Sequence, residues 1–188
     1  MAEGIILAGG FSLRAKTNKM LLNIDDKPII IHTINGMKPF VKRIIVVTGH
    51  YDREIREILK NEQVEIYTNK DYEKGMFSSV LTGVEQVRDD FFIIPGDIPF
   101  VKKETYESLL NGSKEIRFPV YKGKQGHPLF IKKELIGDLL KEPVDSNLKL
   151  FRDKHEKEII EVDDPNILKD IDTIDEYQKI IMERNKAI

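Results

Sequence analysis

The feature that most limits the possible folds is a short apolar run, residues 5–8, that ends abruptly in Gly9 and Gly10. A basic stretch follows, with Arg14 and Lys19. Because glycine has no Cβ, this backbone can turn sharply and bring its N–H groups close to an anion. A guanidinium and an ammonium both suit phosphate oxygens. The stretch therefore predicts a strand that leads into a phosphate-binding loop, although Gly-Gly alone would indicate only an ordinary turn.

Over the first hundred residues, apolar runs of strand length alternate with segments of helical spacing. Strands are expected over residues 5–8, 43–48, 64–68 and 91–94. Helices are expected over residues 28–37, 51–60 and 75–87. This alternation predicts an α/β fold with three layers, in which helices cover both faces of a mainly parallel central sheet.

Ligands of such sheets bind beyond the carboxyl ends of the strands, so the residues that follow the strands should face one crevice. These residues are Gly9, Gly10, Gly49, His50, Asn69 and Asp97. The second half of the chain is less regular. Its expected strands are residues 116–121, 127–131 and 158–162, and its expected helices are residues 103–110, 134–140, 147–152 and 174–183. The turn at residues 122–126 predicts a hairpin-like return, which makes the sheet mixed.

Length and composition exclude several classes of protein. A chain of 188 residues is expected to form one domain, residues 1–188. It has no cysteine and only scattered histidines, so any metal would be held by oxygen ligands. The 30 basic and 32 acidic side chains give no sign of a nucleic-acid partner. No apolar run approaches the roughly 20 residues needed to cross a bilayer, so a cytoplasmic location is expected.

Asp97 is the first carboxylate to consider for chemistry. It follows an apolar strand through Gly96 and precedes Pro99, so its backbone should be fixed and its side chain should project from the end of the sheet. An aspartate that caps a turn or a helix is the structural alternative. From the residues alone, both interpretations stay open.

The glycine loop fits neither of the commonest nucleotide fingerprints, because G-x-G-x-x-G and G-x-x-x-x-G-K-[ST] are both missing. The loop instead resembles the signature L-A-[GA]-G-x-S-x-R-x-G-x-x-K of the MobA-like nucleotidyltransferases. The matching residues are Leu7, Ala8, Gly9, Gly10, Ser12, Arg14 and Lys19. Lys16 stands where the family usually has glycine, which leaves the local shape of the loop open.

Four further segments resemble the same family in the same order. Residues 96–99 match G-D-x-P, which binds the divalent metal, and residues 170–173 resemble D-[IV]-[DN]-T, which returns beside it. Residues 69–79 and 126–130 look like N-x-x-x-x-x-G-M-x-S-S and G-H-P-x-[LF]-F of the molybdenum cofactor cytidylyltransferase branch. The resemblance spans nearly the whole chain and implies a Rossmann-like fold similar to the nucleotide-diphospho-sugar transferases.

The resemblance also implies roles for individual residues. The catalytic group would be Arg14, Lys19 and Asp97, with Mg²⁺ on Asp97 and Asp172. The nucleotide would be bound by Leu7, Ala8, Gly9, Gly10, Ser12, Asn69, Ser78 and Ser79. His127 would contact the acceptor. The alternatives are a helix cap at Asp172, a plain serine-capped helix start at Ser78, and a structural role for His127.

The expected activity is Mg²⁺-dependent transfer of CMP from CTP to a phosphate of molybdopterin, with release of pyrophosphate. GTP stays open as the donor because Gly9 gives L-A-G-G, the form associated with guanylyl members, whereas cytidylyl members usually carry L-A-A-G. A molybdoenzyme would receive the product.

Three other functions remain open at this point. A sugar-1-phosphate nucleotidyltransferase would share the loop and the chemistry. A nucleotide-sugar glycosyltransferase would normally show D-x-D at the end of the fourth strand, where Asp97 is followed by Ile98 and Pro99. A non-catalytic nucleotide-binding regulator or cofactor chaperone is kept open by Lys16.

Overall fold

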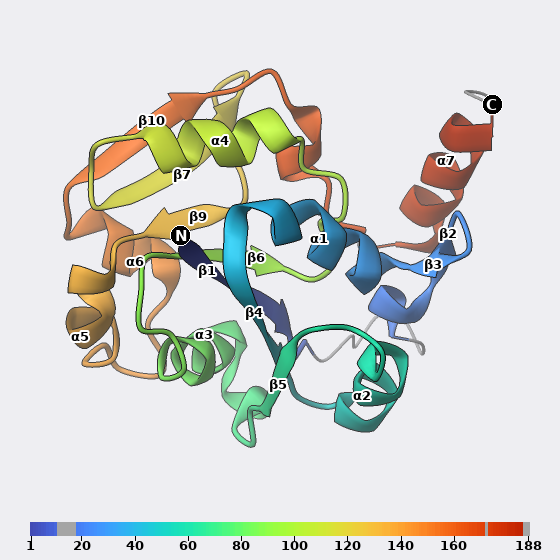
Figure 1. Ribbon diagram of the computed structural model, residues 1–188, viewed down its shortest axis with the longest axis horizontal. Coiled ribbons are helices and arrows are strands. Elements are labelled where there is room, and N and C mark those ends of the chain that lie inside the picture. The colour runs from blue at the N-terminus through green and yellow to red at the C-terminus, as the bar shows by residue number, and fades with distance from the viewer. Residues whose placement is uncertain (11–17, 172, 186–188) are drawn as a thin grey trace.

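The computed structural model describes residues 1–10, 18–171 and 173–185 (Figure 1). The strands of its main sheet are β1 (Ala2–Ala8), β4 (Val41–Thr48), β5 (Glu65–Thr68), β6 (Phe91–Pro95), β7 (Ile116–Tyr121), β8 (Lys124–Gln125), β9 (Leu129–Ile131) and β10 (Lys157–Glu161). Seven of these eight strands run in the order β10-β7-β9-β6-β1-β4-β5, and β8 pairs with β7. A separate two-stranded sheet joins β2 (Asn23–Ile24) to β3 (Lys27–Pro28).

The α-helices are α1 (Ile29–Met37), α2 (Asp52–Leu59), α3 (Met76–Val84), α4 (Lys103–Asn111), α5 (Ile136–Leu139), α6 (Leu148–Asp153) and α7 (Ile174–Asn185). Short 3₁₀ helices cover Lys19–Leu21, Lys38–Phe40, Tyr72–Lys74, Lys133–Leu135 and Pro165–Leu168. None of the described helices combines the length and the apolar composition needed to cross a membrane.

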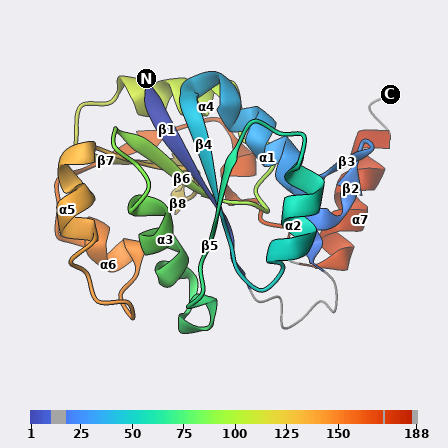
Figure 2. The same ribbon diagram turned by 60° about the horizontal axis from the view of Figure 1, so that its bottom comes forward.

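Two apolar clusters lie on opposite faces of the sheet, which confirms the predicted three layers. One cluster joins Ile6 to buried residues of α1, α2 and α4. The other joins Ile5 and Leu7 to buried residues of α3, α5 and α6 (Figure 2). Because successive residues of a strand point to opposite faces, a strand that is buried on both sides reads as an unbroken apolar run.

The order of the strands creates an opening beside β1. This strand pairs in parallel with β4 on one side and with β6 on the other. After β1 the chain forms β4 and β5 on one side of β1, and it then crosses to the other side to form β6. The connections that follow β1 and β6 therefore lead away from each other. A crevice outside the carboxyl ends of two such strands is where α/β sheets bind ligands.

The second half adds the antiparallel part of the predicted mixed sheet. Strand β9 pairs in antiparallel fashion with both β6 and β7, while β10 pairs in parallel with β7. Strand β9 begins at Leu129, two residues later than expected. The N–H of Gly126 donates to Pro119 O and the N–H of His127 donates to Ile167 O. Gly126 therefore still bonds to β7, whereas His127 leaves the ladder and bonds to the 3₁₀ turn that precedes α7.

Candidate active site

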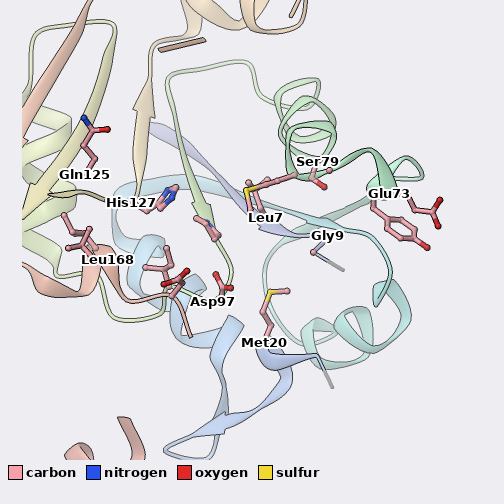
Figure 3. A pocket seen from close by; sticks show the side chains of 18 residues that line it. Leu7, Gly9, Met20, Glu73, Ser79, Asp97, Gln125, His127 and Leu168 are labelled. Carbon is pink, nitrogen blue, oxygen red and sulfur yellow. The ribbon is translucent and has the colours of Figure 1, made fainter. Parts of the chain in front are cut away.

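A cavity of about 750 Å³ lies beyond the carboxyl ends of β1 and β6, within the size range of small-molecule sites. Six sequence-predicted residues line it: Leu7, Gly9, Gly10, Ser79, Asp97 and His127. Figure 3 shows Gln125, His127 and Leu168 together at one end of the cavity, with Gly9, Ser79 and Glu73 at the other. We call these the Gln125 end and the Ser79 end.

The glycine turn after β1 is packed tightly on its inner side. A Cβ placed on Gly9 would lie 2.5 Å from Ser79 Oγ, and one on Gly49 would lie 2.6 Å from Gly9 O. Among the described residues, no atom outside the chain neighbours of Gly10 lies within 4 Å of its Cβ position. Ser79 Oγ therefore opposes a side chain at Gly9, whereas Gly10 is exposed among the described residues and leaves its backbone open to a ligand.

A hydrogen-bond network of Asn69 and two serines supports the Ser79 end. Asn69 Nδ2 donates to Ser78 Oγ at 2.8 Å and to Ser79 Oγ at 2.9 Å. Asn69 Oδ1 accepts from Asp71 N at 2.9 Å, which fixes the orientation of the amide. Ser78 Oγ donates to Gly75 O at 2.7 Å. Only Ser79 of these three predicted residues lines the cavity, so Asn69 and Ser78 hold it in place.

Asp97 stands at the end of β6, where several elements hold its backbone. The preceding Gly96 N donates to Leu7 O at 2.9 Å, and Gly96 O accepts from Thr33 Oγ1 at 2.9 Å. Ile171 N donates to Asp97 O at 3.1 Å. The segment before α7 therefore returns to the end of β6, as its resemblance to the family implied.

Two acidic side chains, Asp97 and Asp170, line the cavity near this contact. Asp172 lies outside the described residues. Within the described part of the chain, no three histidine or acidic side chains converge on a point that could hold a metal ion. A pair of aspartates at the cavity suits Mg²⁺, because this ion keeps several waters and uses one or two carboxylates together with substrate phosphates. It does not need a closed cage of protein ligands.

At the Gln125 end of the cavity the lining side chains Gln125, Ile167 and Leu168 are uncharged, and the cation of Arg152 lies behind Gln125. Burial, and then the nearby cation of Arg152, lower the pKa of His127 to about 4, so its imidazole is neutral at pH 7. His127 Nδ1 is buried and has no hydrogen-bond partner among the described residues. Ile167 and Leu168 form the adjacent apolar wall. This end suits an uncharged part of a ligand.

Two groups of predicted residues remain. Ser12, Arg14 and Lys16 are outside the described residues. Lys19 begins a 3₁₀ helix whose cap is Asn18, with Asn18 Oδ1 accepting from Met20 N at 3.1 Å. Lys19 is not among the residues that line the cavity, nor are Ala8, which is buried in the core, Gly49 and His50.

Sequence reasoning missed some residues that line the cavity. Asp170 is the first residue of the segment that resembles D-[IV]-[DN]-T, so the family resemblance could have identified it. Gln125 lies in the basic turn before the G-H-P segment and had no such signal. Tyr72, Glu73 and Met76 lie between the quoted Asn69 and Ser79, so they could have been included with that segment.

Residues 4–159 match the model of the MobA-like NTP transferase domain. The chain belongs to this family. It is similar to the molybdenum cofactor cytidylyltransferase of Escherichia coli strain K12, with 29% identity over 178 residues that cover 92% of both proteins. This membership makes the chain a nucleotidyltransferase-family enzyme.

Solved structures show the same fold. A nucleotidyl transferase from Methanothermobacter thermautotroptrophicus superposes with a TM-score of 0.85 at 21% identity, covering 100% of this chain and 99% of that one. A Mycobacterium tuberculosis H37Rv protein in complex with manganese superposes with a TM-score of 0.79 at 19% identity, covering 96% and 98%. At these identities the likeness is one of fold.

Proposed function

We propose that this MobA-like nucleotidyltransferase transfers CMP from CTP to a phosphate of molybdopterin and releases pyrophosphate. One observation carries the proposal: the glycine turn, the Asp97 carboxylate and the uncharged Gln125 end border a single cavity. The similarity to the Escherichia coli cytidylyltransferase over 92% of both chains supports this choice of donor and acceptor.

The chemistry needs little acid or base catalysis. The acceptor phosphate is an anion at neutral pH, and its oxygen would attack the α-phosphorus of the nucleotide while the bond to the β-phosphate oxygen breaks. Nothing has to remove a proton from the nucleophile. A pKa of about 4 makes His127 a weak base, which suits a residue that binds rather than one that takes up protons. Catalysis then depends on positioning and on charge stabilisation.

Residues of the chain would divide this work along the cavity. The backbone at Gly9 and Gly10 would hold the nucleotide, and Ser79 would donate a hydrogen bond to it, because its hydroxyl hydrogen goes to no described group. Asp97 and Asp172 are the proposed ligands of Mg²⁺, and the position of Asp170 adds it as a third candidate. When bound, the ion would offset the repulsion between the phosphates, and the manganese complex of the Mycobacterium tuberculosis protein supports a divalent metal.

Two cations would act on the departing pyrophosphate. Arg14 and Lys19 are proposed for this role on the match to the family signature alone. A guanidinium and an ammonium would stabilise the charge that develops as the bond breaks.

GTP is the second candidate donor, and Gly9 is the observation that favours it. Cytidylyl members usually carry alanine at this position, and Ser79 Oγ fills the space that a methyl group would need.

The test is pyrophosphate release with Mg²⁺, in which each of the four NTPs is combined with molybdopterin and with a panel of sugar 1-phosphates. Release with CTP and molybdopterin supports the proposal, and release with GTP changes the base. Release only with a sugar 1-phosphate replaces the acceptor. Nucleotide binding without any release would indicate the non-catalytic regulator or cofactor chaperone.

A further inference from the structure

A buried arginine lies behind the Gln125 end of the cavity. Arg152 belongs to α6 and exposes only 7% of its surface, and its guanidinium lies 4.2 Å from the centre of the Phe118 ring. None of the ion pairs among the described residues includes Arg152, and the neighbouring Asp153 pairs with Lys157 instead. A buried cation usually needs a carboxylate or several carbonyl partners, since removing charge from water is costly.

The single hydrogen bond that the Arg152 side chain makes to a described residue goes to Gln125. Arg152 Nη2 donates to Gln125 Oε1 at 2.8 Å. A guanidinium has donors only, so the oxygen of the amide must face Arg152 and the NH₂ group must point elsewhere. No described residue accepts a hydrogen bond from that NH₂ group, and Gln125 lines the cavity (Figure 3). The amide therefore has an acceptor side held by Arg152 and, on an exposed residue, a donor side that bonds to no described group.

We propose that Arg152 is a positioning residue that orients Gln125, so that the Gln125 NH₂ group donates to an uncharged hydrogen-bond acceptor on the substrate that supplies the attacking phosphate. A carbonyl oxygen or a ring nitrogen has the required chemistry. The neutral His127 and the apolar side chains of Ile167 and Leu168 border the same end, which agrees with an uncharged group there. The inference deepens the proposed function and rests on it for the identity of the substrate.

Arg117 provides a matched control. It is also a buried arginine, 3% exposed, and its guanidinium lies 4.5 Å from the centre of the Phe130 ring. It donates to Leu109 O at 2.8 Å and to Lys114 O at 2.8 Å, and it does not line the cavity. The Arg117→Met variant should lose stability without disturbing Gln125.

The first measurement needs no substrate. The side-chain NH₂ signals of Gln125 are assigned in an NMR spectrum by their loss in Gln125→Met, and their ¹⁵N relaxation is then recorded. We expect an ordered amide in the wild type and in Arg117→Met, and a mobile amide in Arg152→Met. An amide that is equally ordered in Arg152→Met would overturn the positioning role.

The second measurement is kinetic and uses CTP and molybdopterin. Gln125→Glu keeps a partner for Arg152 but replaces the donor by a carboxylate oxygen. We expect the KM for molybdopterin to rise about tenfold, the effect of one lost hydrogen bond, while the KM for CTP stays unchanged. Arg152→Met should raise the same KM, and it should add nothing in a Gln125→Met background. Effects that multiply in the double variant would overturn the inference.

The two measurements separate this inference from the proposed function. A wild type that releases no pyrophosphate with CTP and molybdopterin overturns the proposed function. The relaxation of the Gln125 amide then still decides whether Arg152 orients it.

Discussion

Replacing Gly9 with alanine tests whether the glycine turn and Ser79 form one packed unit. The new Cβ would lie 2.5 Å from Ser79 Oγ, but 3.6 Å from Ser79 Cβ and 3.6 Å from Thr48 O. Only the hydroxyl oxygen is too close. Gly9 is not among the described glycines that have a positive φ, so alanine is compatible with its backbone conformation. The expected cost therefore comes from space alone.

The size of the expected destabilisation follows from the hydrogen bond that Ser79 would lose. Its hydroxyl accepts from Asn69 Nδ2 at 2.9 Å, and moving away from a methyl group on residue 9 would break that bond. Losing one such hydrogen bond costs about 1 kcal/mol, and overpacking that cannot relax costs about 1–3 kcal/mol. We expect Gly9→Ala to lower the free energy of unfolding by about 1–2 kcal/mol.

A double-mutant cycle with Ser79→Ala provides the assay. The free energy of unfolding is measured by urea denaturation for the wild type, both single variants and the double variant. In the Ser79→Ala background the hydroxyl is gone, so Gly9→Ala should be neutral or stabilise the fold by several tenths of a kcal/mol. The two changes should therefore couple by about 1 kcal/mol or more. Additive effects would refute the idea that the Ser79 hydroxyl is what requires glycine.

Three other predictions concern charge and protonation. Asp97→Asn, and Lys19→Ala separately, should each lower turnover by about 100-fold with the fold intact, because each removes a charge that is placed for the transition state; near-normal turnover in both variants would contradict the proposed chemistry. Chelation of divalent ions should abolish pyrophosphate release, and added Mg²⁺ should restore it; activity in excess chelator would exclude the proposed metal. Burial lowers the pKa of His127 from 6.5 to about 4 in the folded chain. The unfolded state therefore binds more protons between these two pH values. The free energy of unfolding should therefore fall as the pH drops from 6.5 towards 4. Over this range the urea midpoint of the wild type should fall more steeply than that of His127→Gln, and equal slopes would contradict this pKa shift.

The sequence by itself determined the layered α/β architecture and the position of the glycine turn at the end of β1. Apolar periodicity, glycine and proline act over a few residues, so residues 43–48 and 91–94 could be recognised as buried strands without knowledge of their neighbours. The family signature likewise lies mostly in short segments. A general rule of parallel sheets predicts that the carboxyl ends of the strands meet at one edge. This rule correctly placed Gly9 and Asp97 beside one cavity.

Only the tertiary structure decided which side chains border that cavity and which merely support it. Asn69 turns towards the serines of α3, and Arg152 reaches Gln125 from a helix that follows it by more than twenty residues. Whether Gly9 leaves room for a methyl group depends on Ser79, which lies in α3. Such contacts are set by how helices pack on the sheet, and no local pattern in the sequence encodes the distance between two elements that meet only after folding.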